Sequence, residues 1–240
     1  MTQLCQIWDD SHYIRINASK RCIKFWFRIR KLPMNRYTRL CYDMLKLYDT
    51  LGYTNWVTSV RTNLYTNGFG YIWENQTEIN DKLFLFEYVQ RLKDQYVQSW
   101  RTNCENSRKL CTFKDFKVSF MIEPYVTIID VAKFRKCMAL FRCSSHNLMI
   151  EKGRHHDIHI EDRNCIYCEC VLENEFHFVL VCPLYNDIRL KYIDEFFRND
   201  ICYRKFCLLL SCKNESTIRK LAMYLFYAFE CRTEFLKGRE

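Results

Sequence analysis

The stretch that organises the chain lies in its C-terminal half and reads Arg163-Asn164-Cys165-Ile166-Tyr167-Cys168-Glu169-Cys170-Val171-Leu172-Glu173-Asn174-Glu175-Phe176-His177-Phe178-Val179-Leu180-Val181-Cys182-Pro183. Within it, four residues form the pattern C-x2-C-x8-H-x4-C: Cys165, Cys168, His177 and Cys182. Two thiolates on a tight turn, followed by an imidazole and a third thiolate about one helical turn apart, are what a closed tetrahedral zinc site takes from a short segment. The stretch therefore predicts a Zn2+ ion bound by these four side chains.

The high cysteine content leaves alternatives open for this segment. The chain has 15 cysteines, so C-x2-C spacings also arise by chance, and buried thiols without a metal are the other interpretation. The histidine followed by a cysteine at x4 favours the metal. Other residues also have suitable side chains: Cys170 in place of Cys168, and His155, His156 or His159 in place of His177.

The flanking residues carry a resemblance to a known family. Acidic Glu173 and Glu175 precede the run Phe176-His177-Phe178-x3-Cys182-Pro183-Leu184-Tyr185, and the segment from Phe141 to Arg154 leads up to the pattern. Together they resemble the CCHC zinc-binding module that follows the reverse transcriptase domain in LINE-type, non-LTR retrotransposon proteins. The resemblance is specific over residues 130–200 and diffuse from about 20 to 129. It implies the C-terminal piece of a mobile-element protein, separated from its polymerase, that holds template RNA or target DNA near a reverse transcriptase.

Composition and hydrophobic spacing predict a mainly α protein. A chain of 240 residues with 49% hydrophobic residues can bury one good core or two small ones, and strand signals are scarce. We expect a multi-helix body with a small zinc-pinned helical subdomain. The expected divisions are a helical region at 1–142 with a basic N-terminal helix, the CCHC module at 143–200, and C-terminal helices that pack on the module at 201–240.

Apolar spacing places the individual helices. The first is expected at about 14–31, and the second carries an apolar stripe of Tyr37, Leu40, Cys41, Met44, Leu47, Tyr48 and Leu51 before Gly52. A third starts near Thr54 or Asn55 and stops at Asn67-Gly68. Residues 69–73 form a turn, and a long helix covers 80–103 with a core-facing stripe. Further helices are expected at 106–120 and from Ser145 to Gly153. Another follows an N-cap at Asp130, and its solvent-facing side carries Lys133, Arg135, Lys136 and Arg142. The last helix has an apolar stripe from Ile218 to Phe229 and ends at Gly238.

The positive charge is unevenly placed. The net charge is +9, and the residues from Ser11 to Tyr42 include no acidic side chain but nine basic ones. Such a cluster favours a polyanionic partner, nucleic acid before a membrane surface, whereas the alternative is a solvated helix face. The candidate nucleic-acid-binding residues are Arg21, Lys24, Arg28, Arg30 and Lys31, joined by Lys152, Arg154 and Arg163, which the zinc would hold near one another and near Arg189. Binding would be electrostatic and steep in salt.

Catalytic motifs are missing or incomplete. Three cysteines and one histidine close a zinc shell and leave no position for water, so the zinc is expected to be structural. His159-x-Glu161 partly matches a zinc deaminase, but only three residues separate it from Cys165, and Asn164 stands where that family has proline. Trp8-Asp9-Asp10 is similar to a reverse transcriptase aspartate pair without the upstream carboxylate. We expect no enzyme activity and no reverse transcriptase catalytic domain in this chain.

The remaining expectations concern compartment and partners. The N-terminal residues lack the pattern of a secretory signal, and no run of residues is long and apolar enough for a membrane span. The sequence therefore predicts an intracellular protein of the nucleus or cytoplasm with reduced thiols and no membrane partner. RNA or DNA is the expected partner, with a reverse transcriptase domain as another, and the oligomeric state is open. The competing interpretation is a zinc-stabilised helical scaffold that binds proteins and no nucleic acid.

Overall fold

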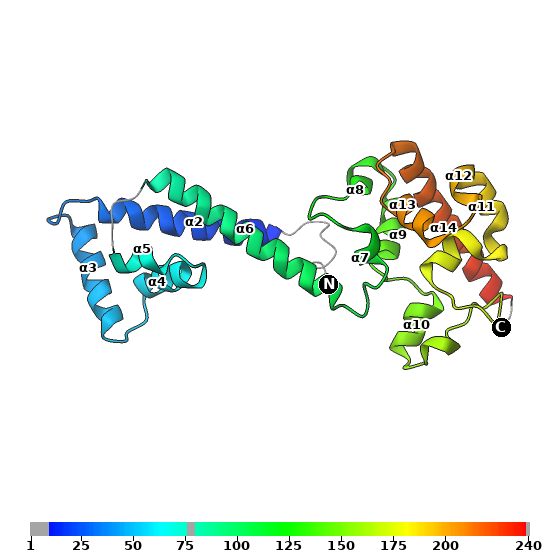
Figure 1. Ribbon diagram of the computed structural model, residues 1–240, viewed down its shortest axis with the longest axis horizontal. Coiled ribbons are helices and arrows are strands. Elements are labelled where there is room, and N and C mark those ends of the chain that lie inside the picture. Colours follow the sequence, from blue (N-terminus) through cyan, green and yellow to red (C-terminus); the bar gives the residue numbers. More distant parts are fainter. Residues whose placement is uncertain (1–9, 76–79, 239–240) are drawn as a thin grey trace. The chain divides into compact units, whose positions relative to one another are not determined.

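The protein is built from helices in two compact units. A computed structural model describes residues 10–75 and 80–238 (Figure 1), and these divide into one unit that ends at Arg101 and one that begins at Thr102. Across the described residues the only β pairing is an isolated antiparallel bridge between Asn164 and Leu172, and no extended strand is formed. The expectation of a mainly α fold is confirmed.

None of the helices in the described part of the chain combines the length and apolar character of a membrane span.

Five helices of the described chain form the N-terminal unit, and the apolar spacing predicted all of them except the short one at residues 70–75. They are α2 (Asp10–Arg30), α3 (Tyr37–Thr50), α4 (Trp56–Thr66), α5 (Gly70–Asn75) and α6 (Asp81–Glu105), the last of which continues past the unit boundary. Helix α4 begins close to the predicted start, and Asn55 caps it, because its Oδ1 accepts the Val57 amide at 2.8 Å. Gly52 and Gly68 end α3 and α4 with φ of +91° and +82°, which side chains with a Cβ rarely adopt.

Aromatic side chains form the core of this unit. Trp26 stacks on Trp73 with ring centroids 5.7 Å apart and donates its Nε1 hydrogen to the Tyr42 hydroxyl at 3.1 Å. The stripe of α6 lies in the core as expected, with Tyr88 buried. The predicted turn at 69–73 is wrong, because Phe69, Ile72 and Trp73 are buried and the chain forms α5 there. The free energy gained by burying these side chains outweighs the preference of Gly68 and Gly70 for a turn.

Helix α3 presents its apolar stripe to solvent. Tyr42 is buried in the core and Leu45 packs against it, whereas the stripe residues Tyr37, Leu40, Met44, Leu47, Tyr48 and Leu51 are exposed. The helix itself was predicted correctly. Its core-facing side is therefore a narrow second face, and the broad hydrophobic face is left uncovered within the described chain.

The C-terminal unit packs short helices around one long one. Its elements are α7 (Phe113–Phe116), α8 (Pro124–Ile128), α9 (Ala132–Arg142), α10 (Met149–His155), the 3-10 helix η1 (Ile160–Asp162), the π-helix η2 (His177–Val181), the 3-10 helix η3 (Pro183–Tyr185), α11 (Asn186–Tyr192), α12 (Glu195–Arg198), α13 (Tyr203–Leu210) and α14 (Glu215–Lys237). Helix α14 contacts α8, α9 and α11. The expected division points at 142/143 and 200/201 both fall inside this single unit.

Several local predictions fail in this unit. Only Phe113–Phe116 is helical within the expected helix at 106–120, and a further short helix, α8, begins at Pro124. Asp130 does not cap α9, since Val131 occupies the N-cap position and the Asp130 carboxylate binds Arg219 at 2.7 Å. Proline is well suited to the first turn of a helix, where its missing N–H is not needed.

Arg142 lies inside the protein and not on the outer face of α9, where the sequence placed it. Its Nη2 binds the Glu123 carboxylate at 2.6 Å, its Nη1 donates to the Leu210 carbonyl at 2.5 Å, and its guanidinium lies 4.3 Å from the centre of the Phe116 ring. Lys117 binds the other oxygen of Glu123 at 2.5 Å. Burial lowers the pKa of Arg142, and the attraction of Glu123 opposes that shift. The arginine joins α8, α9 and α13.

Candidate metal centre

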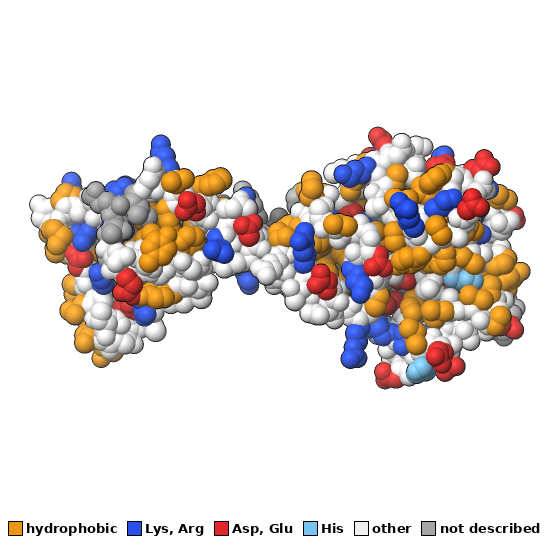
Figure 2. Space-filling view, in the orientation of Figure 1, with side chains coloured by type: hydrophobic (Ala, Val, Ile, Leu, Met, Phe, Trp, Pro, Cys, Tyr) orange, Lys and Arg blue, Asp and Glu red, His pale blue; other side chains and the backbone are white. Residues whose placement is uncertain are grey.

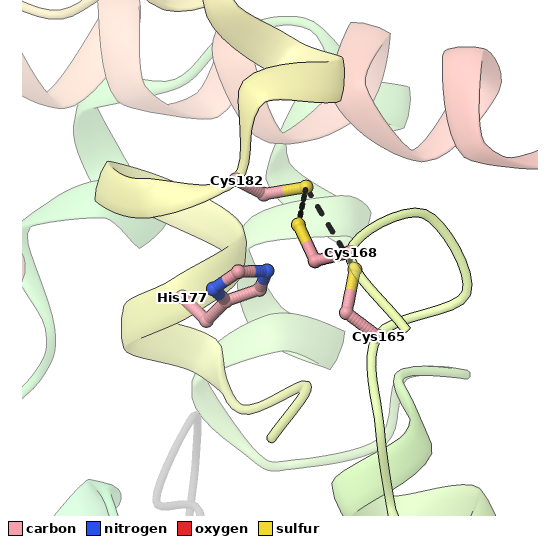
Figure 3. A group of neighbouring side chains, drawn as sticks. All are labelled: Cys165, Cys168, His177 and Cys182. Atoms are coloured by element: carbon pink, nitrogen blue, oxygen red, sulfur yellow. Dashed lines mark hydrogen bonds between the residues drawn. The ribbon is translucent and has the colours of Figure 1, made fainter. Parts of the chain in front are cut away.

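Four side chains from two neighbouring segments converge at one point of the C-terminal unit (Figure 3). Cys165 and Cys168 come from the loop after η1, while His177 and Cys182 come from η2 and its end, and their ligand atoms all lie within 4.8 Å of one another. The Sγ of Cys182 is 3.8 Å from that of Cys165 and 3.9 Å from that of Cys168. Two sulfurs that share a tetrahedral metal ion at about 2.3 Å are separated by about 3.8 Å. The cluster could hold a metal ion.

A tight loop orients the sulfur atoms of Cys165 and Cys168. The Cys165 amide donates to the Val171 carbonyl at 2.7 Å, next to the bridge between Asn164 and Leu172, and the Glu169 amide donates back to the Cys165 carbonyl at 2.8 Å. Glu169 has a φ of +60°, a left-handed conformation that is uncommon outside glycine. These hydrogen bonds close the loop and turn both thiols toward the same point.

The π-helix aligns the other two ligands. Residues five apart point in different directions on an α-helix with 3.6 residues per turn, so His177 and Cys182 would diverge there. In η2 the Cys182 amide donates to the carbonyl of His177 at 2.8 Å, which is the i to i+5 bond of a π-helix. This wider turn places the imidazole and the thiol on one side. The H-x4-C spacing fits a π-helical turn.

Two buried side chains satisfy the backbone of η2. Arg189 donates from Nε to the Val179 carbonyl at 2.9 Å and from Nη2 to the Cys182 carbonyl at 2.7 Å, and the Tyr224 hydroxyl donates to the Phe178 carbonyl at 2.7 Å. Carbonyl groups at a helix end need such donors when they are buried. Arg189 therefore supports the cluster from inside and is not a surface residue, contrary to the expectation from the sequence.

The electrostatics of the cluster suit a cation. A hydrogen bond with Cys182 lowers the pKa of Cys165 to about 3, with further help from His177 and backbone amides. The same interaction raises the pKa of Cys182, because a second thiolate would lie beside the first. Both ring nitrogens of His177 are buried without a hydrogen-bond partner among the described residues. A bound metal ion would compensate adjacent thiolates and take up one imidazole nitrogen.

Two buried glutamates tie the cluster to the rest of the unit. Glu173 binds Arg232 of α14 at 2.7 Å and accepts the Met149 amide at 2.7 Å, and burial raises its pKa to about 6. Glu175 binds the Nε2 of His146 at 3.1 Å and accepts from Thr112 at 3.0 Å. Burial alone would raise the pKa of Glu175, but these hydrogen bonds lower it. The sequence showed the two glutamates but gave no signal of Arg232 or His146 as their partners.

The basic residues of α2 lie on the protein surface. Arg21, Lys24 and Arg28 are exposed and are spaced 3 and 4 residues apart, so they share one side of α2, and Lys31 is exposed directly after the helix ends at Arg30. Lys31 also binds Asp81 at 2.6 Å. Arg30 is half-buried, with its guanidinium 4.7 Å from the centre of the Trp26 ring.

The basic residues near the cluster divide into exposed and internal ones. Lys152 is exposed, whereas Arg154 binds Glu151 at 2.6 Å. Arg163 turns inward, where its Nη1 donates to the Ile150 carbonyl at 3.0 Å and its Nη2 to the Ile158 carbonyl at 2.8 Å. The side chain also passes so close to Gly153 that a Cβ there would lie 2.6 Å from it. Arg163 therefore braces the loop and offers little to a phosphate.

The alternative ligands lie outside the cluster. Cys170 is exposed and its thiol donates to the Cys168 carbonyl at 3.3 Å. His155, His156 and His159 are all exposed, and His159 lies 3.9 Å from the Glu161 carboxylate. Trp8 and Asp9, which were considered in a polymerase-like aspartate pair, are outside the described residues.

Comparisons of the chain with protein-family models, with curated proteins and with solved structures found no match.

Proposed function

We propose that the cluster binds one structural Zn2+ ion. The ligand set supports this identity, because three thiolates and one imidazole at tetrahedral spacing are typical of closed zinc sites. Zinc in such a site contributes folding free energy and supplies no open position for a substrate. The loop at 165–171 and the π-helix η2 orient the four ligand side chains, and Arg189 stabilises η2 through its hydrogen bonds.

Metal content of the purified chain tests the zinc proposal. We expect one zinc per chain by mass spectrometry, with the zinc lost in Cys165→Ala, His177→Ala and Cys182→Ala. Cys170→Ala is the matched control, since this nearby thiol is exposed and outside the cluster, and it should keep the full metal content. A well-folded wild-type chain without metal would disprove the site.

We further propose that the protein is a non-catalytic nucleic-acid-binding module. The observation that carries this proposal is the exposed basic face of α2, which lies in a segment with no acidic residue from Ser11 to Tyr42. Arg21 to Lys31 span about 15 Å along the helix, enough to follow two or three phosphates of a nucleic acid strand. Helix residues with long basic side chains can neutralise phosphates without reading bases, so binding would be insensitive to sequence.

Salt dependence and charge reversal test nucleic-acid binding. With two or three neutralised phosphates, log K should fall against log salt with a slope of about −1.5 to −3, measured by fluorescence anisotropy with labelled RNA and DNA strands. The variant Arg21→Glu/Lys24→Glu/Arg28→Glu should lose binding. The control Arg204→Glu/Lys213→Glu/Lys237→Glu changes three exposed basic residues of the other unit and alters the net charge equally. Equal losses in both variants, or affinity independent of salt, would contradict a specific role for α2.

The CCHC pattern and its flanks support a mobile-element origin within this proposal. The module would be related to the zinc-binding segment after the reverse transcriptase domain of non-LTR retrotransposon proteins. Its parent role would then be to hold RNA or target DNA beside a polymerase carried by another chain or domain.

A second candidate function is a zinc-stabilised scaffold that binds proteins. It is favoured by the exposed apolar stripe of α3, which a nucleic-acid-binding surface does not need. Failure of both RNA and DNA to bind the zinc-loaded chain would leave this function as the better one.

A further inference from the structure

The exposed stripe of α3 has the spacing of a helix-pairing seam. Tyr37, Leu40, Met44, Leu47 and Leu51 follow one another at intervals of 3, 4, 3 and 4 residues, the a and d positions of a heptad pattern. All five are exposed, with Tyr37 at 87% and Leu51 at 63% relative accessibility. In the views of the molecule, hydrophobic side chains gather along the edge of the N-terminal unit where α3 lies (Figure 1 and Figure 2). A helix that meets this face would bury the whole stripe.

The area of the stripe matches what one partner contributes to a stable interface. With Tyr48 and Tyr53, the exposed side chains offer on the order of 800 Å² of mostly apolar surface, about the share of each partner in an interface of standard size. Scattered single hydrophobic residues on a surface need no explanation, but a continuous apolar helix face of this size does.

The residues beside the stripe fit a second copy better than a charged partner. No charged residue lies within the stripe, and the charged side chain beside it, Asp43, is bound to Arg39 at 3.1 Å. The stripe therefore offers no surface of opposite charge to a strongly acidic or basic partner. In a dimer with two-fold symmetry, each contact between two different residues is made twice, once from each copy.

An antiparallel pair of α3 helices gives a consistent register. Pairing a with d′ positions sets Leu40 against Leu51 of the other copy and Met44 against Leu47. Beside the seam, Asp43 then faces Thr50, a hydroxyl donor, and Cys41 faces Tyr48, so no two like charges meet. Antiparallel helices also align their dipoles favourably.

We propose that the chain forms a homodimer in which two α3 helices pack antiparallel through this stripe. The dimer is built in the N-terminal unit and does not depend on nucleic-acid binding or on the metal. Two protomers would bring two basic α2 helices into one particle.

Sedimentation velocity of the zinc-loaded full chain tests the dimer. We expect a dimer at tens of micromolar that dissociates on dilution, and at least tenfold weaker association for Met44→Glu/Leu47→Glu with an unchanged circular dichroism spectrum. The control Leu83→Glu/Phe86→Glu places two charges on exposed apolar residues of α6 and should leave the dimer intact. A wild-type chain that stays monomeric, or a dimer that survives Met44→Glu/Leu47→Glu, would overturn the proposal.

A charge-swap variant tests the register. In the antiparallel arrangement, Met44→Lys/Leu47→Glu sets the introduced lysine of each copy against the introduced glutamate of the other. This variant should therefore dimerise clearly better than Met44→Glu/Leu47→Glu. In a parallel arrangement the same variant would set lysine against lysine and glutamate against glutamate. Equal loss of association in the two variants would overturn the antiparallel pairing.

Discussion

At the scale of single residues, Asp49 is an ion-pair partner whose effect on stability depends on pH. Arg61 binds it with two hydrogen bonds, Nε to Oδ2 at 2.8 Å and Nη2 to Oδ1 at 3.1 Å, and this lowers the pKa of the carboxyl below its ordinary value of 3.8. The stabilisation is therefore present above about pH 3.8 and is lost as the pH falls through the lower pKa of the folded state.

Asp49→Asn should lower the free energy of unfolding by about 1 kcal/mol at pH 7, because the ion pair is partly exposed. The difference from wild type should begin to shrink as the pH falls below about 3.8 and should continue to shrink through the lower pKa of the folded state. Urea unfolding followed by tryptophan fluorescence measures both values. Glu87→Gln, an exposed carboxyl of α6, should show no such pH dependence. A constant difference across the pH range would mean that Asp49 acts through packing alone.

Arg142 is a residue whose position the sequence misjudged, and it gives a second prediction at this scale. Arg142→Ala leaves the Leu210 carbonyl without its donor and leaves Glu123 with Lys117 as its remaining ion partner. We expect a loss of about 3 kcal/mol in unfolding free energy, measured by chemical denaturation. Lys136→Ala, on the exposed side of the same helix, should change stability by less than about 0.5 kcal/mol. Similar small effects of both substitutions would place Arg142 at the surface.

At the scale of elements, the π-helix depends on donors from outside itself. Arg189→Met keeps most of the side-chain volume but leaves the Val179 carbonyl without this donor and the Cys182 carbonyl with only the long hydrogen bond from the Tyr185 amide at 3.4 Å. We expect a loss of about 2 to 4 kcal/mol and release of the metal at lower chelator concentration, because the position of Cys182 is no longer fixed. A chelator titration followed with a metal dye measures the second effect.

The control for Arg189 lies on the same helix. Lys191→Met makes a similar change at an exposed position of α11 and should leave metal retention as in the wild type. If Arg189→Met retained its metal equally well, the π-helix would be held by Tyr224 and local packing alone.

At the scale of the whole molecule, the two units should respond differently to metal removal. Four of the five tryptophans, Trp26, Trp56, Trp73 and Trp100, belong to the N-terminal unit, whereas all four cluster ligands belong to the C-terminal unit. A chelator should therefore lower the midpoint of thermal unfolding seen by circular dichroism in the C-terminal unit, while tryptophan fluorescence from the N-terminal unit keeps its transition. Restoring zinc should restore the first transition. A common shift of both signals would show that the units unfold together.

Local chemistry explains what could be predicted. The start of α4 next to Asn55, the glycines that end α3 and α4, and the four cluster ligands within 18 consecutive residues, Cys165 to Cys182, all depend on neighbours in sequence. Caps, left-handed turns and short metal patterns work over a few residues, so their residue types reveal them.

The sequence alone determined that this protein is helical, where most of its long helices lie, and which side chains form the cluster. Only the tertiary structure decided that Arg142, Arg163 and Arg189 turn inward, that Phe69 to Trp73 build a helix, and that the stripe of α3 faces outward. The physical reason is that periodicity shows that a helix has an apolar face but not what covers it. A long arginine side chain, likewise, turns inward only where folding has gathered carbonyl or carboxylate acceptors from distant parts of the chain.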